Sequence, residues 1–383
     1  MSAPLAKGAG GFEPARYPQE RPPGYPGPTR PSLGRGFIAY LVRHPIFCLF
    51  LLTPGIPEYL SSSSSITLLF VSPAVFFVFL GLNAGLYVPG ALLIREAVVR
   101  WHNGWSTVIL LGTAYALTEE GIALGTIFNP IHDSLGHYFG LNWVWTPAVI
   151  MVHVVFSIGL PILLLGLAVP STRGRSLVGR RGIGIAFVVL AIDVVVLGYV
   201  TRSVVGFHLG WVAILATCAA IVALVLAAYV EPGHPLDPRV GLPKRTPRQL
   251  GALCAVVVVL SFLIPPIGTS AGAPFWVLDI LFAPLYGLAF VVVVRGVGTE
   301  QNAPQLIGVA AGFLVPLAAI GFLFALPTPV VGVLDVALGV FLWSLWRRYG
   351  SVRTPEKIPV GGTVVTVPPH VLQSSLESRG ATK

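Results

Sequence analysis

Long apolar segments recur along almost the whole chain, and they restrict its fold more than any other feature. With 55% hydrophobic residues, 10% charged residues and a mean hydropathy of +0.82, the chain cannot present a water-facing surface on every side. About 20 helical residues at 1.5 Å per residue cross about 30 Å of hydrocarbon, where open backbone groups find no partner. The sequence therefore predicts an all-α, polytopic transmembrane helix bundle.

Ten segments are candidate membrane spans. They cover residues 44–60, 66–94, 105–127, 146–169, 183–201, 207–230, 251–268, 274–294, 304–326 and 328–346. The first is the least regular, because Pro54 and Pro57 interrupt a short apolar core. It is expected either to cross the membrane or to form a broken, re-entrant or interfacial helix.

The basic residues separate by side in this arrangement. With ten spans and both termini cytoplasmic, only Arg202 of the 24 Lys and Arg residues falls on the outer side. Adding or removing one span in the middle of the chain would scramble this separation, so the pattern predicts the topology. The same bias, facing anionic lipid, accounts for the net charge of +9, and no nucleic-acid partner is expected.

The rest of the chain has no room for a soluble catalytic domain. Residues 1–35 are rich in Pro and Gly, which predicts a disordered cytoplasmic tail before a transmembrane domain at residues 36–346. Residues 347–383 are a second cytoplasmic tail, in which "VGGTVVTV" favours a small hairpin. The chain has no CxxC, Walker-type, GxGxxG or HExxH motif, which weighs against a nucleotide-driven pump, a dinucleotide enzyme and a zincin.

Two adjacent carboxylates, Glu119 and Glu120, interrupt the third span. At 1.5 Å per residue Glu119 lies about 12 Å below the outer boundary, and His153 on the fourth span lies about 10 Å below it. Ionisable groups at such depth are costly and normally face a bundle interior or a wet cavity. Adjacent carboxylates also repel each other. We therefore expect Glu119, Glu120 and His153 to share an outward-facing polar site and to be its catalytic candidates.

Other ionisable residues fall in the same layer. Asp193, Asp279 and Asp335 lie about 8 to 12 Å below the outer face on three other spans, and His208 lies near the outer end of the sixth. They are candidates for binding or ion coupling. For each acid a purely structural role stays open, in which it is protonated or hydrogen-bonded to a neighbouring helix and only fixes packing.

The neighbours of the glutamates suggest a tightly packed site. Tyr115 lies one turn below Glu119 and can donate a hydrogen bond to it, while Gly121 and Gly125 form a GxxxG that allows close helix approach. The following outer loop adds Asn129 and Asn142, with interfacial tryptophans beside them. A solvated loop is the expected setting of its polar groups, although Asn129 remains a binding candidate.

The Glu119-Glu120 pair with His153 on the next span resembles the first two motifs of the CPBP intramembrane protease superfamily, which includes the CAAX prenyl proteases and bacteriocin-processing relatives. The resemblance covers about residues 105–200. It implies a four-helix core in which a glutamate activates water and histidines stabilise the oxyanion, so that peptide bonds in or near the membrane are hydrolysed. Leu124 and Val149 stand where the family has Arg and Phe, and no His occurs in the fifth span. The stretch from Gly90 to Pro130 also resembles uncharacterised prokaryotic multi-pass membrane proteins.

Residue chemistry leaves three functions open. A carboxylate beside an imidazole can act as a general base toward water, as a hydrolase requires. Acids at one depth on separate spans are instead typical of a proton- or cation-coupled secondary transporter. Spans that are interrupted by proline favour the same function. A non-catalytic membrane scaffold would need none of this polar layer.

Cofactor and partner expectations are few. No cofactor is evident, and a metal ion held by Glu119, Glu120 and His153 is conceivable although no ligand spacing demands it. The expected partners are the lipid bilayer and a small-molecule, ion or membrane-peptide substrate. The expected location is the cell membrane.

Overall fold

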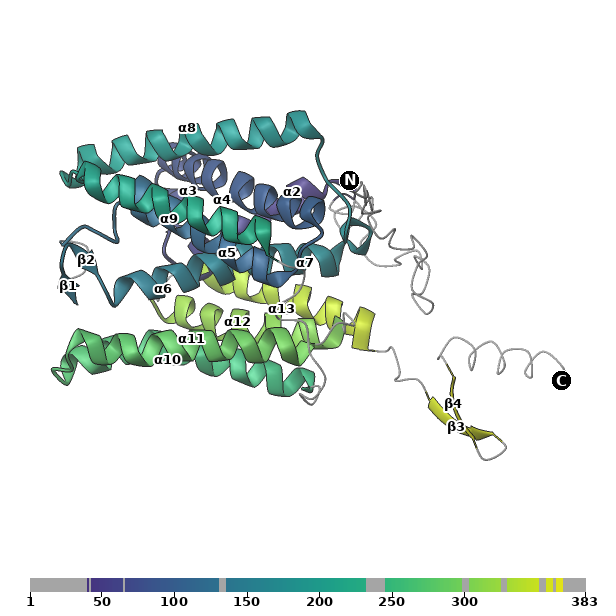
Figure 1. The fold of residues 1–383 in the computed structure, drawn as a ribbon. Coiled ribbons are helices and arrows are strands. Elements are labelled where there is room, and N and C mark those ends of the chain that lie inside the picture. Colours follow the sequence, from purple (N-terminus) through teal and green to yellow (C-terminus); the bar gives the residue numbers. More distant parts are fainter. Residues whose placement is uncertain are drawn as a thin grey trace, which may run out of the picture. The chain divides into compact units, whose positions relative to one another are not determined.

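The structure is a computed structural model, and its transmembrane domain is a bundle of helices (Figure 1). It describes residues 40, 43–64, 66–130, 136–231, 245–297, 303–324, 329–350, 356–360 and 363–367. The predicted tail at residues 1–35 lies outside the described residues, as does most of the predicted tail at residues 347–383.

The helices of the described chain follow the ten predicted ranges in order. They are α2 (Pro45–Pro54) with η1 (Gly55–Leu60), α3 (Leu68–Val71) with α4 (Pro73–Trp101), α5 (Trp105–Ala116) with η2 (Leu117–Ala123), α6 (Trp145–Val152) with η3 (His153–Gly159) and α7 (Leu160–Ala168), α8 (Arg180–Val205), α9 (Trp211–Val230), α10 (Pro247–Ser270), α11 (Phe275–Val297), α12 (Ala303–Phe324) and α13 (Pro329–Gly350). A 3₁₀ turn (Pro170–Thr172) follows α7, and the two-residue strands β1 (His137–Tyr138) and β2 (Leu141–Asn142) pair in the loop before α6.

Six of these helical stretches are long and apolar enough to cross a membrane by length and composition. They are α4, the continuous run Trp145–Ala168, α8, α9, the Pro247–Pro265 part of α10, and α12. The protein is therefore an all-helical, multi-pass membrane protein. Ten crossings and cytoplasmic termini stay predictions, since four of the ten predicted spans are not among these six stretches.

Several helix ends differ from the predicted ranges by three or more residues, and two of them lie on the helices that carry the site. The second span was expected to end at residue 94, but α4 continues to Trp101 and ends where His102 adopts a left-handed conformation with φ 58°. The third helix stops at Ala123, four residues early, and Gly125 turns the chain with φ +68°. A residue without Cβ adopts that conformation at low cost, so Gly125 ends the helix instead of extending a GxxxG face.

Buried charges explain why α4 runs on past its apolar part. Glu96 is 1% exposed and pairs with Arg95 at 2.9 Å and with Arg100 at 3.3 Å. Its carboxylate also accepts hydrogen bonds from the backbone N–H of Leu177, at 2.7 Å, and from the hydroxyl of Ser176. The ion pairs satisfy the carboxylate inside the helix and fasten the loop before α8 to the end of α4.

The helix of the fourth span lies at the centre of the bundle. Its η3 segment packs against η1, α2, α4 and α5, while α7 contacts α12. By contrast, α8 and α9 cover α4, α5 and η2 from one side and expose large apolar side chains such as Val195 and Trp211. Figure 1 shows α8 and α9 at this edge of the bundle. Apolar faces of this size suit contact with lipid.

Three π-helical segments, η1, η2 and η3, interrupt the helices of the first, third and fourth predicted spans. The Leu124 N–H bonds the Glu119 carbonyl and the Leu160 N–H bonds the Val155 carbonyl, both five residues back. Each segment therefore contains one residue more per turn than an α-helix. Such segments are rare and occur frequently at functional sites.

A second compact unit contains the strands β3 (Glu356–Val360) and β4 (Thr363–Val367). They pair in antiparallel register, with Val360 opposite Thr363. The hairpin predicted from "VGGTVVTV" is thus confirmed.

Candidate functional site

A buried imidazole joins the two adjacent glutamates. His153 Nε2 lies 2.9 Å from Glu120 Oε1, and His153 Nδ1 lies 3.2 Å from Glu119 Oε2 and 3.1 Å from the hydroxyl of Ser157. The three titratable side chains are 3 to 7% exposed. Because neighbouring residues on a helix diverge in direction, the two carboxylates reach His153 at different ring nitrogens. One imidazole can thus compensate two carboxylates that would otherwise repel each other.

The loop that follows η2 holds the second glutamate in place. The hydroxyl of Thr126 donates to Glu120 Oε2, so both carboxylate oxygens of Glu120 have partners. Thr126 is held in turn by Asn142, whose side-chain amide donates to the Thr126 carbonyl at 2.7 Å and to the Asn129 carbonyl at 2.8 Å. Glu120 is therefore anchored from two sides.

The expected solvation of this loop is wrong for its two asparagines. Asn142 is fully buried and Asn129 is 3% exposed. The hydrogen bonds of the Asn142 amide tie the turn after η2 to the start of α6. Burial strengthens these bonds because water does not compete for them. Asn129 belongs to this loop framework through its backbone carbonyl.

Two tyrosines enclose the imidazole. The Tyr87 ring stacks near His153 at 6.1 Å between centroids, and the Tyr115 ring meets it edge-on at 6.0 Å. Both hydroxyls are neighbours of the Glu119 carboxylate, as the spacing of Tyr115 and Glu119 predicts. The Tyr115 hydroxyl and Glu119 Oε2 are buried, yet neither makes a hydrogen bond of good geometry within the described chain. Glu119 thus keeps an oxygen and a nearby donor available, whereas Glu120 does not.

A third carboxylate, Glu58 on η1, extends the site. The Tyr87 hydroxyl donates to Glu58 Oε1 at 2.6 Å, and the Ser64 hydroxyl donates to Glu58 Oε2 at 2.6 Å. Asn83 contacts the same serine at 3.5 Å. Glu58 therefore holds the hydroxyl of Tyr87, whose ring lies against His153. Glu58, Tyr87 and Thr126 were not predicted from the sequence. The available signal for Glu58 was its position as an acid directly after Pro57 in the first predicted span.

Small residues let the helices approach one another here. A Cβ on Gly90 would lie 2.3 Å from the Tyr115 ring, so α4 and α5 approach closely only because Gly90 has none. A Cβ on Gly121 would lie 2.9 Å from the Thr217 side chain of α9. The close helix approach expected at Gly121 is confirmed.

Asp193 lies at the edge of the site. It is 9% exposed, its Oδ1 would lie 2.8 Å from a Cβ on Gly85 of α4, and it acts electrostatically on Tyr115. Its Oδ2 is buried without a hydrogen-bond partner in the described residues. Asp193 is therefore adjacent to the Glu119–Glu120–His153 cluster without contacting its carboxylates directly.

The remaining candidates do not join the cluster. Asp279 on α11 and Asp335 on α13 are half-buried, and no hydrogen bond or ion pair among the described residues links either one to Glu119, Glu120 or His153. His208, in the turn before α9, is exposed. The prediction that His153 lies near the two glutamates is correct. Equal depth along the spans does not determine which helices are neighbours, however, so it did not bring Asp279 and Asp335 to the cluster.

In the part of the chain that the structure describes, one group of three side chains could hold a metal ion. Glu119, Glu120 and His153 each offer one ligand atom, and these atoms lie within 4.8 Å of one another. Carboxylate and imidazole ligands suit zinc and several other divalent transition metals. The two ring nitrogens of His153 face different carboxylates, so an ion shared by all three would replace at least one imidazole–carboxylate contact.

The comparisons with known proteins identify a family. Residues 47–354 match the model of an uncharacterised membrane protein family, and the chain belongs to that family. No curated protein and no solved structure is significantly similar to the chain. The family match includes every residue of the Glu58, Glu119, Glu120 and His153 cluster.

Proposed function

We propose that this member of the uncharacterised membrane protein family is a glutamate-dependent intramembrane hydrolase that cleaves peptide bonds of membrane-embedded substrates. The observation that carries the proposal is the buried contact of His153 with both Glu119 and Glu120, beside two tyrosine hydroxyls. A carboxylate with a nearby imidazole and hydroxyl donors is the arrangement that general-base hydrolysis requires.

Glu119 is the general base in this proposal. Its Oε2 has no well-formed hydrogen bond, whereas both oxygens of Glu120 are occupied by His153 and Thr126. Glu119 would take a proton from a water molecule, and the resulting hydroxide would attack the carbonyl carbon of the substrate. The proton then passes to the leaving amine as the C–N bond breaks, which yields a carboxylic acid and an amine.

The other residues act on charge and orientation. The Tyr115 hydroxyl is buried beside Glu119 without a hydrogen bond of good geometry, which suits a donor to the oxyanion of the tetrahedral intermediate. His153 would help to balance the negative charge that develops there. Glu120 is a positioning residue that holds His153, and Glu58 positions Tyr87.

The resemblance to the CPBP superfamily supports the same chemistry. Its Glu-Glu pair and the histidine of the next span correspond to Glu119, Glu120 and His153, which the structure brings together. The family's arginine and second histidine have no counterparts here, since Leu124 occupies the arginine position. In this proposal the Tyr115 hydroxyl supplies the donor that a second histidine would provide, because the Tyr87 hydroxyl already donates to Glu58.

A cleavage assay tests the proposal. The full chain, purified into nanodiscs, is incubated with a library of membrane-spanning peptides, and products are identified by mass spectrometry. We expect cleavage that falls at least about a hundredfold in Glu119→Gln. The matched control is Asp335→Asn, which makes the same carboxylate-to-amide change outside the cluster. Cleavage that survives Glu119→Gln would refute the role of that residue, and no cleavage by the parent protein would refute the hydrolase.

A proton- or cation-coupled secondary transporter is the second candidate function. Asp193, Asp279 and Asp335, on three other helices, each have a buried carboxylate oxygen without a hydrogen-bond partner in the described residues. Unpaired acids inside a membrane protein favour ion coupling. We expect a carrier to depend on Asp279 and Asp335 as strongly as on Glu119. Proton-coupled uptake into liposomes that is lost in Asp279→Asn and Asp335→Asn, without peptide cleavage, would replace the hydrolase with the carrier.

A further inference from the structure

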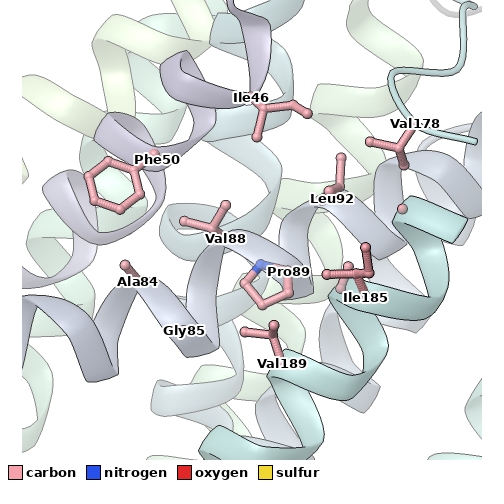
Figure 2. A pocket seen from close by; sticks show the side chains of 12 residues that line it. Ile46, Phe50, Ala84, Gly85, Val88, Pro89, Leu92, Val178, Ile185 and Val189 are labelled. Carbon is pink, nitrogen blue, oxygen red and sulfur yellow. The ribbon is translucent and has the colours of Figure 1, made fainter.

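An apolar groove opens between α2, α4 and α8, away from the Glu119–Glu120–His153 cluster (Figure 2). Its volume is about 450 Å³, and all twelve lining residues are apolar or glycine. This size falls in the range of about 300 to 1,000 Å³ that is typical of small-molecule sites. The floor is made of buried residues of α4 and α8, including Ala84, Leu92 and Ala186.

Exposed apolar side chains form the walls of the groove. Ile46 of α2 is 39% exposed, and Ile185 and Val189 of α8 are 65% and 41% exposed. In Figure 2, Ile46 and Phe50 lie across the groove from Ile185 and Val189. An elongated apolar space that opens toward lipid suits a hydrocarbon chain better than a polar molecule, because none of its lining side chains has a hydrogen-bonding group.

Positive charge gathers where the groove begins. Val178 and Gly182 line this end, and Arg180 and Arg181 lie between them in sequence. Arg43 lies three residues before Ile46 in the sequence, next to the start of α2. All three arginines are exposed, and within the described chain none has a hydrogen bond or ion pair.

The start of α8 adds a further attraction for anions. The helix begins at Arg180 after Gly179, which provides no side-chain cap for its first backbone N–H groups, and the first turn contains no acid. Free N–H groups at a helix start attract anions, and arginines bind phosphate in two-point contacts. The charges therefore complement a phosphate placed at the mouth of the apolar groove.

We propose that the groove between α2, α4 and α8 binds one acyl chain of an anionic phospholipid, whose phosphate headgroup contacts Arg180, Arg181 and Arg43. The proposal combines two observations, a groove lined only by apolar residues and glycine, and exposed arginines near one end of it. The arginines lie at the end where α4 finishes and α8 begins, which the basic-residue pattern predicts to be cytoplasmic. The bound lipid is therefore expected to come from that leaflet.

Native mass spectrometry of the full chain tests this site. The protein is released from micelles that contain equal amounts of phosphatidylglycerol, phosphatidylethanolamine and phosphatidylcholine with the same acyl chains. We expect preferential retention of phosphatidylglycerol. The double change Arg180→Gln/Arg181→Gln should lower that retention about tenfold or more. The control Arg245→Gln/Arg248→Gln removes the same charge from exposed positions at the start of α10 and should change it little.

Two matched tryptophan variants test whether the groove itself binds the acyl chain. Val189→Trp fills the groove, whereas Ile192→Trp places the same ring three residues along α8 at a bilayer-exposed position that does not line it. We expect lipid retention to fall only in Val189→Trp. The proposal would be overturned if the three lipids were retained equally, or if the two double arginine variants lost the same amount of lipid. It would also be overturned if the two tryptophan variants retained equal amounts of lipid. Glu119→Gln should leave lipid retention unchanged. The lipid-binding test is therefore independent of whether the protein is a hydrolase.

Discussion

Replacing His153 with alanine tests whether one imidazole stabilises two buried carboxylates. The substitution leaves Glu119 Oε2 and Glu120 Oε1 buried without the ring nitrogens that lie 3.2 and 2.9 Å away. Each unsatisfied buried polar group costs about 1 to 3 kcal/mol, and breaking a buried ion pair costs about 3 to 5 kcal/mol. We therefore expect His153→Ala to lower the free energy of unfolding by about 3 to 5 kcal/mol.

The control is His208→Ala, because His208 is exposed and should change stability by less than about 0.5 kcal/mol. Unfolding by SDS in mixed micelles, followed by tryptophan fluorescence, measures both values. In a Glu119→Gln/Glu120→Gln background the His153→Ala cost should fall by at least about 2 kcal/mol, since the uncompensated charges are gone. An equal cost in both backgrounds would show that the imidazole acts by packing alone, and the charge argument would be wrong.

Two further substitutions probe the packing around the site and the clamp at the far end of α4. Gly90→Ala places a Cβ 2.3 Å from the Tyr115 ring and should cost about 1 to 3 kcal/mol of unfolding free energy, whereas Gly81→Ala, with open space around it, should be neutral or stabilising. Glu96→Gln weakens the ion pairs that fasten the loop of residues 170–179, so limited proteolysis should cut this loop faster than in the parent protein. Unchanged cleavage would mean that the neutral hydrogen bonds hold the loop by themselves.

The proximity of Glu119 and His153 followed from the sequence, but the lateral positions of the other acids did not. Counting 1.5 Å per residue put Glu119 and His153 at one level, and they are in contact. The same count put Asp279 and Asp335 at that level, yet the described contacts do not link them to the cluster. Helix rise is a property of the backbone, whereas the choice of neighbouring helices depends on tertiary packing that one sequence does not display.

The polar partners were missed for a related reason. Glu58 follows two prolines that made the first segment look broken, and it reaches the site because η1 continues the helix in a π-helical form. Tyr87 looks like an ordinary aromatic residue in an apolar span, and only its contact with Glu58 marks it as polar. Asn142 looked like a loop residue, although its amide is required to fold that loop inward.

The three π-helical segments also determine how this chain tolerates insertions and deletions. A π-helical turn is equivalent to an α-helix that has gained one residue, so the helix on each side of it keeps its own angular phase. Removing one residue from His153–Gly159 would restore a regular α-helix and leave the angular phase of α7 unchanged, whereas removing one residue from the regular helix α7 would rotate the rest of that helix by about 100°. The first deletion would keep the buried face of α7 against α12, but the second would turn part of it toward lipid. The extra residue is thus absorbed where His153 lies, and the half of the helix that anchors the bundle does not depend on it.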